Sequence, residues 1–228
     1  MFPAPRRGLP LIVAALLALA SAPALAIEAF TADYQASYMG LQADGSMSLS
    51  PQAGDQWQYT LEIRNNLGVL SQSTRFDVVD GQYRPLSSLD KTLLLVKRKT
   101  VETTYDWNQR QATWSGDVKA DRAGPAALRN GDMDALLINL AVIRDLAAGK
   151  PLKYRMVENG RVSPMSYQVL GKETISVAGK QVSATKLSRT SGRRETVVWV
   201  APDLPAPARI LQREDGKDSI DLRIRSWN

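Results

Sequence analysis

The sequence predicts a mainly β protein: a single antiparallel, strongly curved meander sheet that forms a closed or half-open barrel, with one amphipathic helix covering or plugging it. Three observations support this prediction. Short runs of alternating apolar and polar residues recur from residue 30 to residue 227, which is the period of half-buried strands. Pairs that favour tight hairpin turns, among them Asp80-Gly81, Asn159-Gly160 and Asp215-Gly216, separate the runs. Clear helical periodicity is confined to residues 132–149.

The first residues have the pattern of a secretory signal peptide. Arg6 and Arg7 precede an apolar run from Leu9 to Ala20, and Ala24-Leu25-Ala26 is a small-residue cleavage site. The apolar run is shorter than the roughly 20 residues that a membrane-spanning helix needs. We therefore expect residues 1–26 to be removed by cleavage after Ala26, and the mature chain to be periplasmic with no transmembrane span.

Composition restricts the chemistry that the mature chain can perform. Residues 27–228 suit one β-rich, barrel-like domain. The whole chain has a formal charge of +6 and contains neither Cys nor His; without Arg6 and Arg7 the charge is +4. The absent residue types exclude disulfides, a catalytic His base, a Cys nucleophile and the usual zinc sites. We expect no cofactor, no metal and no nucleic-acid partner.

Antiparallel strands are expected through the first half of the chain. Residues 30–40 and 57–64 alternate apolar and polar side chains, and residues 70–79 and 82–88 form a predicted hairpin. Asp44-Gly45 is interpreted as a possible turn. This part of the chain therefore predicts a meander.

Two segments in the middle of the chain leave alternatives open. Leu93 to Val96 is apolar on both faces, which fits a central strand or the lip of a cavity. Lys97 to Lys99 follows as KRK, either a solvated strand end or a patch for anions or a membrane surface. Residues 117–131 have no strand period and fit a mobile lid or a plain connection.

After the helix, the strand pattern returns at once. Hairpin turns and alternating residues predict strands at 150–158, 161–171, 173–177, 180–189, 195–201, 208–213 and 219–227. We expect roughly eleven or twelve short strands in all, the spacing typical of all-β folds.

The predicted helix has recognisable ends. Asp132 or Asp134 can cap its start, and Gly149 can end it. Its apolar stripe must be buried, which a position over the bent sheet allows. Arg144 either satisfies carbonyls near the C-terminus or turns inward to hold a carboxylate such as Glu173, or the acidic head of a bound amphiphile. Asn139 lies close to the apolar stripe and needs partners if it is buried.

Aromatic residues supply the other binding candidates. They either line a cavity for a lipid chain or a sugar, or fill an ordinary core. The set is Tyr34, Tyr38, Trp57, Tyr59, Tyr105, Trp107, Trp114 and Trp199. Of these, the candidate ligand-binding residues are Tyr59, Tyr105, Trp107 and Trp199, together with Arg144 and Glu173.

Carboxylates are the remaining candidates for catalysis. Acid and base roles can be assigned to Asp132 with Asp134, to Asp77 with Asp80, or to Glu195 or Glu173. Helix capping and turn formation account for the aspartates equally well. No catalytic residue is assigned.

Several stretches together resemble an exported bacterial family, the domain of unknown function 3108. They are DALLINLAVIRDLAAG, LGKETISVAGKQVSATKL and VVWVAPDLPAPARI. The matching positions are Asp134, Arg144, Gly149, Gly171, Glu173, Gly179, Trp199 and Pro205. The resemblance implies a β-rich, barrel-like periplasmic fold and no established activity.

Three functional hypotheses follow. The first is a non-enzymatic periplasmic protein that binds a hydrophobic or amphiphilic envelope molecule, such as a lipid, between the curved sheet and the helix. The second is an interaction or assembly factor that docks on an envelope protein through a sheet edge or the KRK patch. The third is a carboxylate-based enzyme acting on envelope polysaccharide, which requires two carboxyl groups roughly 5 to 10 Å apart in one cleft.

Overall fold

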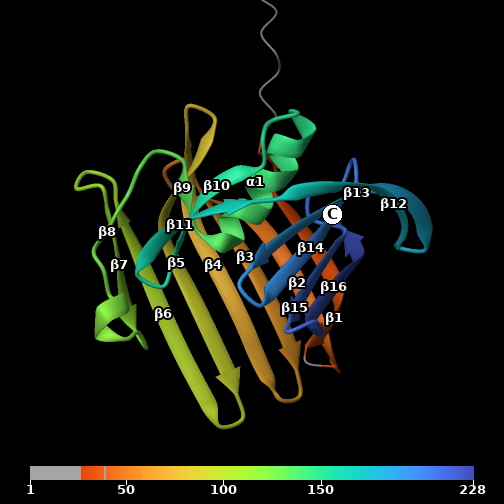
Figure 1. Cartoon of the computed structure of the whole chain (residues 1–228), viewed down its shortest axis with the longest axis horizontal. Coiled ribbons are helices and arrows are strands. Elements are labelled where there is room, and N and C mark those ends of the chain that lie inside the picture. The colour runs from red at the N-terminus through yellow and green to blue at the C-terminus, as the bar shows by residue number, and fades with distance from the viewer. Residues whose placement is uncertain (1–26, 39) are drawn as a thin grey trace, which may run out of the picture.

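The computed structural model describes residues 27–38 and 40–228 and shows a large curved sheet with one helix lying across it (Figure 1). The predicted signal peptide lies outside the described residues. Within them there are sixteen strands, one α-helix and a single turn of 3-10 helix, η1 (Ala120–Arg122).

The larger sheet has thirteen strands, and all its neighbouring pairs are antiparallel. In spatial order the strands are β12 (Gln168–Val177), β13 (Lys180–Ser191), β14 (Arg194–Val200), β15 (Arg209–Glu214), β16 (Lys217–Trp227), β1 (Phe30–Tyr38), β2 (Leu41–Gln52), β3 (Gln56–Asn65), β4 (Gly68–Val79), β5 (Gln82–Leu94), β6 (Lys97–Asp106), β7 (Gln111–Gly116) and β8 (Ala126–Ala127). The sheet is thus a meander in which β16, the last strand, pairs with β1, the first.

A smaller sheet lies beside the helix. It consists of β11 (Arg161–Ser166), β10 (Lys153–Glu158) and β9 (Asp132–Met133). The pairing of β9 with β10 is parallel, and the Arg155 guanidinium on β10 donates to Asp132 on β9 with an Nε–Oδ1 distance of 2.6 Å. Two residues are too few to show a strand period, so the sequence did not predict this second sheet.

The predicted fold class is confirmed, and of its two alternatives the half-open barrel is correct. The larger sheet does not close: β12 and β8 form its two edges. Its concave face is covered by α1 (Ala135–Ala147), which packs against β3, β4, β5 and β10.

The predicted helix is confirmed with a later start. Asp134 is the N-cap: its carboxylate accepts from the backbone N–H of Leu137 at 2.8 Å. Asp132 instead belongs to β9. Gly149 follows the helix with a φ of 63°, a left-handed conformation that glycine adopts without strain. Leu140 and most of its apolar neighbours on the helix are buried.

The predicted turn at Asp44-Gly45 is wrong. Both residues lie inside β2, where Gly45 pairs with Tyr34 on β1. A Cβ at Gly45 would lie 3.1 Å from the Tyr34 Cβ and 3.3 Å from a methyl group of Leu222. Glycine is therefore present to let two core side chains pack closely. In the sequence, a glycine with this role cannot be distinguished from one that forms a turn.

Leu93 to Val96 does not form a central strand. Leu93 and Leu94 end β5, while Leu95 and Val96 form the turn to β6, and both turn side chains are exposed. Lys97 to Lys99 begins β6 and is exposed as well. The segment from residue 117 to 131 is a connection along β7, since the backbone of Trp114 bonds to Ala123 at 2.8 Å.

The alternation of antiparallel strands gives the sheet two distinct ends. The turns after β1, β3, β5, β13 and β15 all lie at one end, which we call the turn end. The C-terminal part of α1 lies at the other end, where Arg144 donates to the Gly81 carbonyl in the β4–β5 turn at 3.1 Å. Figure 1 shows the β5–β6 hairpin at the bottom of the view and α1 at the top.

Candidate functional site

A pocket of about 590 Å³ lies between the helix and the turn end of the sheet. One wall comes from β3, β4 and β5, and the facing wall comes from β13, β14, β15 and β16. The first turns of α1 and the small sheet form the roof. The pocket exists because α1 fills only part of the concave face and leaves the remainder unoccupied by protein.

The floor and inner walls of the pocket are apolar. Aliphatic and methionine side chains from both arms of the sheet, the helix and the small sheet meet there. They are Leu61, Ile63, Leu70, Leu136, Met156, Met165, Ile210, Ile220 and Leu222. The lining as a whole combines this apolar part with about as much polar surface, and a volume of this size is typical of small-molecule sites.

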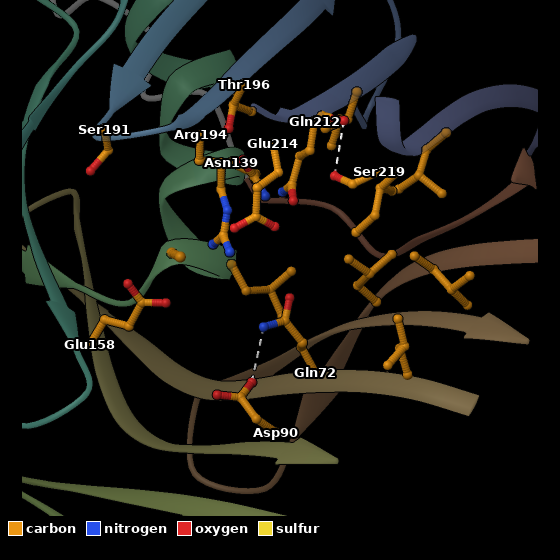
Figure 2. Close-up of a pocket in the computed structure, with 18 of the residues that line it drawn as sticks. Gln72, Asp90, Asn139, Glu158, Ser191, Arg194, Thr196, Gln212, Glu214 and Ser219 are labelled. Carbon is orange, nitrogen blue, oxygen red and sulfur yellow. Dashed lines mark hydrogen bonds between the residues drawn. The ribbon is translucent and has the colours of Figure 1, made fainter. Parts of the chain in front are cut away.

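The rim of the pocket carries charges of both signs. The cations are Lys91, Arg189, Arg193 and Arg194, and the carboxylates are Asp90, Glu158 and Glu214. Figure 2 shows Gln212 and Glu214 on one wall facing Gln72 and Asp90 on the other. The Gln72 amide donates to Asp90 at 3.1 Å, which orients that carboxylate. An apolar interior with a charged rim suits a molecule that has one apolar and one polar part.

Two polar atoms at the pocket wall lack hydrogen-bond partners among the described residues. They are the hydroxyl of Thr196 and the Nε of Arg189. Thr196 is only 3% exposed, and an unpaired buried hydroxyl costs free energy. Asn139 of α1 lies half-buried at the same pocket. Asn139 therefore offers hydrogen bonds to a ligand in the pocket, whereas neighbouring side chains close off the two unpaired atoms.

The environment of Asp90 raises the pKa of its carboxyl above the ordinary value. The surrounding protein withdraws water from the charged form, and the nearby Glu158 acts in the same direction. The hydrogen bond from Gln72 and the charge of Lys99 partly oppose this. The charged form of Asp90 is therefore less favoured in the folded protein than in water.

A second, smaller pocket of about 190 Å³ adjoins the first. Asp90 and Leu136 line both. The smaller pocket also contains Asp134, whose carboxylate accepts from the Thr74 hydroxyl at 2.8 Å. Burial raises the pKa of Asp134 to about 6, although its hydrogen bonds to Leu137 and Thr74 act to lower it.

The aromatic binding candidates lie away from the larger pocket. Tyr59 is fully buried, with its hydroxyl 3.3 Å from the Met47 sulfur, and burial raises its pKa. Tyr105 is buried in a separate cluster at the β6–β7 side of the sheet. Trp107 donates to the Pro85 carbonyl at 2.6 Å.

Trp199 is also buried, beneath two cations. The Arg209 guanidinium lies 4.7 Å from its ring centroid and the Lys186 ammonium 5.1 Å. The same Lys186 ammonium pairs with Glu173 at 2.9 Å, and this contact lowers the pKa of Glu173. Lys186, Arg209 and Glu173 thus surround one tryptophan at the outer edge of the core.

Arg144 is not brought together with Glu173. Its guanidinium pairs with Asp145 at 2.8 Å and lies 4.4 Å from the centroid of the Tyr83 ring. None of the six candidate ligand-binding residues is among those that line the larger pocket. Their role in ligand binding stays a prediction.

Most of the carboxylates considered for acid and base roles have structural partners, and Asp80 lies in the β4–β5 turn. Asp132 is held by Arg155, and Asp77 by Arg84. Glu195 pairs with Arg213 at 3.1 Å. Among residues 27–38 and 40–228, no three His, Cys, Asp or Glu side chains gather in a way that could hold a metal ion.

Sequence reasoning missed most of the pocket. Its walls come from strands far apart in the chain, and their inward residues look like any half-buried strand position. Asn139 was singled out because a polar residue beside an apolar helical stripe needs partners, and it does line the pocket. A second signal of the same kind is Thr196, a polar residue within the apolar run TVVWVA.

Comparison with known proteins places the chain in a family and supports the fold. The family model described as "Protein of unknown function (DUF3108)" matches residues 33–222. A crystal structure of a beta-barrel-like protein of domain of unknown function DUF1849 from Brucella abortus is similar with a TM-score of 0.56 and 11% identity, covering 88% of this chain and 97% of that one. At this identity the likeness shows the fold alone. No curated protein shows significant sequence similarity to this chain.

Two other solved structures are more distant. The complex of MucA and MucB from Pseudomonas aeruginosa has a TM-score of 0.33 and 11% identity, covering 88% of this chain and 51% of that one. A putative outer membrane lipoprotein-sorting protein domain from Vibrio parahaemolyticus has a TM-score of 0.23 and 10% identity, covering 90% and 86%. These scores are too low to support a functional argument. Over the part of the chain that the structure describes, no helix is long and apolar enough to cross a membrane.

Proposed function

This chain belongs to the DUF3108 family of proteins of unknown function, and we propose its function from the geometry of its pocket: it binds an amphiphilic molecule of the cell envelope, without catalysing a reaction. The apolar part of the ligand occupies the interior between α1 and the two arms of the sheet. Its polar part lies at the charged rim.

The observation that carries this proposal is the contrast between the interior and the rim of the 590 Å³ pocket. Nine aliphatic or methionine side chains face a space that no described side chain fills. Burial of an alkyl group there is favourable by about 0.8 kcal/mol per CH₂. Asn139 and the charges of both signs at the rim can bind the polar part.

The location of the protein is part of the same proposal. The secretory signal pattern of residues 1–26 supports export to the periplasm, where lipids and other amphiphiles of the envelope are present. The catalytic alternative is weaker because most of the carboxylates considered for it are engaged in ion pairs or in capping the helix, and Asp80 lies in the β4–β5 hairpin turn.

Dye binding tests the proposal. The mature protein is expected to bind N-phenyl-1-naphthylamine with increased fluorescence, and a long-chain fatty acid or lysophospholipid is expected to displace the dye. A double variant, Leu70→Trp with Ile220→Trp, fills the pocket from facing walls and should weaken dye binding about tenfold or more, since space for the apolar part is lost.

A matched control is available outside the pocket. Val169→Trp with Leu170→Trp also introduces two tryptophans, at exposed positions on β12, and should bind the dye like the parent. Native mass spectrometry of protein purified from its host gives an independent measurement. The proposal fails if no lipid-like mass accompanies the protein and the folded parent does not bind the dye.

A further inference from the structure

The turn end of the sheet carries an exposed apolar tip formed by two adjacent hairpins. Four side chains make up this hairpin tip: Leu67 in the β3–β4 turn, Leu93 at the end of β5, and Leu95 and Val96 in the β5–β6 turn. They are 42%, 46%, 78% and 100% exposed, respectively. Isolated exposed leucines are common, but four apolar side chains gathered on neighbouring turns point to an interaction surface.

The hairpin tip is held together by its backbone. The Leu95 N–H donates to the Leu67 carbonyl at 3.1 Å, which links the two turns. Gly68 has a φ of 154°, and a Cβ there would lie 1.9 Å from the Leu93 carbonyl oxygen. The chain therefore needs a glycine at this position to bring the two hairpins together. The apolar side chains are presented on an ordered scaffold.

Cations surround the apolar residues. Lys91, Lys97, Arg98 and Lys99 are all exposed, and no acidic residue occurs from position 91 to position 101. The exposed Glu102 follows these cations on β6, and three carboxylates lie on or beside neighbouring strands, of which only Glu62 is paired with a cation among the described residues. Glu62 pairs with Arg64, Asp90 accepts from Gln72, and Asp117 accepts from the Thr100 N–H at 2.7 Å.

We infer that this hairpin tip docks the protein on the surface of an anionic lipid bilayer. Leu95 and Val96 enter the interface between head groups and acyl chains, while the cations lie at the level of the lipid phosphates. An apolar element flanked by Lys and Arg has the charge complementarity that binding to such a surface requires. A uniformly polar partner surface would leave the four apolar side chains without a contact.

Docking in this way brings the pocket close to the membrane. Lys91 and Thr92, which precede the hairpin tip on β5, line the pocket. Figure 1 shows the β5–β6 hairpin projecting at the end of the molecule opposite to α1. Membrane docking is a separate property from ligand binding. It does not depend on ligand binding, because the hairpin tip is present whether or not the pocket holds a ligand.

Vesicle sedimentation tests the inference. The mature protein is expected to bind vesicles of phosphatidylglycerol mixed with phosphatidylcholine, and to bind vesicles of phosphatidylcholine alone about tenfold or more weakly. Binding should decrease in about 0.5 M salt, because salt screens exposed charges. The double variant Leu95→Ser, Val96→Ser should weaken binding about tenfold, and the triple variant Lys97→Gln, Arg98→Gln, Lys99→Gln by at least as much.

Matched controls change the same residue types elsewhere on the surface. Val169→Ser with Leu170→Ser alters two exposed apolar residues on β12, and Lys150→Gln with Lys153→Gln and Lys180→Gln removes three exposed cations. Both controls should bind the vesicles like the parent. The hairpin-tip variants should keep the parental melting temperature and dye binding, which separates this inference from the proposed ligand binding.

Three results would overturn the inference. In the first, the parent does not bind anionic vesicles. In the second, the control variants lose as much binding as the hairpin-tip variants. In the third, crosslinking in the cell envelope captures a specific protein through Lys97 to Lys99 and anionic vesicles do not compete for it, which assigns the surface to a protein partner instead.

Discussion

The two halves of the concave face differ in what fills them. Towards the helix end, α1 places Leu137, Ile138 and Leu140 against the sheet, and the aromatic rings of Tyr59 and Phe76 complete a closely packed core. Towards the turn end, the same sheet faces the 590 Å³ pocket. One curved sheet thus serves as the wall of a core at one end and as the wall of a binding site at the other.

Two buried threonines differ in their hydrogen bonding. At the start of the helix, beside the smaller pocket, the Thr74 hydroxyl donates to Asp134, and Asp134 also caps the helix. In the open half, the equally buried Thr196 hydroxyl has no partner within the described chain. Satisfied buried groups stabilise a folded structure, whereas unsatisfied ones lower stability. Within the described chain, the unpaired polar atoms of Tyr105, Tyr154 and Trp199 lie outside the larger pocket, so the contrast belongs to the two threonines and not to whole halves of the sheet.

The largest expected effect comes from placing a charge in the filled half. Leu140→Asp buries a carboxylate among apolar side chains, so it should lower the free energy of unfolding by at least about 3 kcal/mol. Leu95→Asp makes the same substitution on an exposed turn and should change it by less than about 0.5 kcal/mol. Urea denaturation of both variants measures the difference.

Two further results complete this comparison. If Leu140→Asp does not fold, Leu140→Ala should still cost about 2 to 5 kcal/mol through the cavity that it leaves. Equal stability of the two aspartate variants would mean that α1 is a loosely attached cover, and that the filled half is not a core.

The second effect concerns pH. Burial raises the pKa of Asp134 from 3.8 to about 6 in the folded protein. Between about pH 4 and pH 6 the folded state therefore binds more protons than the unfolded state, and stability falls as the pH rises through this range. The expected loss from this one group is on the order of 2 to 3 kcal/mol.

Asp134→Asn isolates this contribution. Asparagine caps helices about as well as aspartate but does not titrate. The other carboxyl groups titrate alike in the parent and the variant, so the difference between their stability profiles reports Asp134. Denaturation at several pH values should show that the free energy of unfolding of the variant rises relative to that of the parent from about pH 4 to pH 6. Parallel profiles would contradict the raised pKa.

The filled half was more accessible to sequence reasoning than the open half. The helix, its Asp134 cap, its Gly149 end and the buried stripe containing Leu140 were all predicted, because capping and helical periodicity are local properties. The antiparallel meander was predicted for the same reason, since strand alternation and hairpin turns are local as well, but the sequence left open whether the barrel closes.

The open half depends on curvature and register, which are not local. Leu70 on β4 and Ile220 on β16 look like ordinary strand residues, and only the bend of the sheet places them on facing walls. Large aromatic residues drew attention as cavity lining, yet Tyr59 and Trp199 are buried in the core. A large ring is as well suited to filling a core as to lining a cavity, so residue type alone could not separate the two.

The smallest expected effects come from one pair of matched substitutions. Thr74→Val removes a hydroxyl that donates to a buried carboxylate, so it should cost about 1.5 to 3 kcal/mol. Thr196→Val removes a hydroxyl that has no partner in the described structure, so the unliganded protein should be unchanged or more stable by up to about 1 kcal/mol. Urea denaturation measures the change in the free energy of unfolding for both variants. Dye displacement by a lysophospholipid then shows whether the Thr196 hydroxyl contributes to binding. Equal costs for the two variants would mean that Thr196 has a bonding partner of its own, and the contrast between the two threonines would no longer hold.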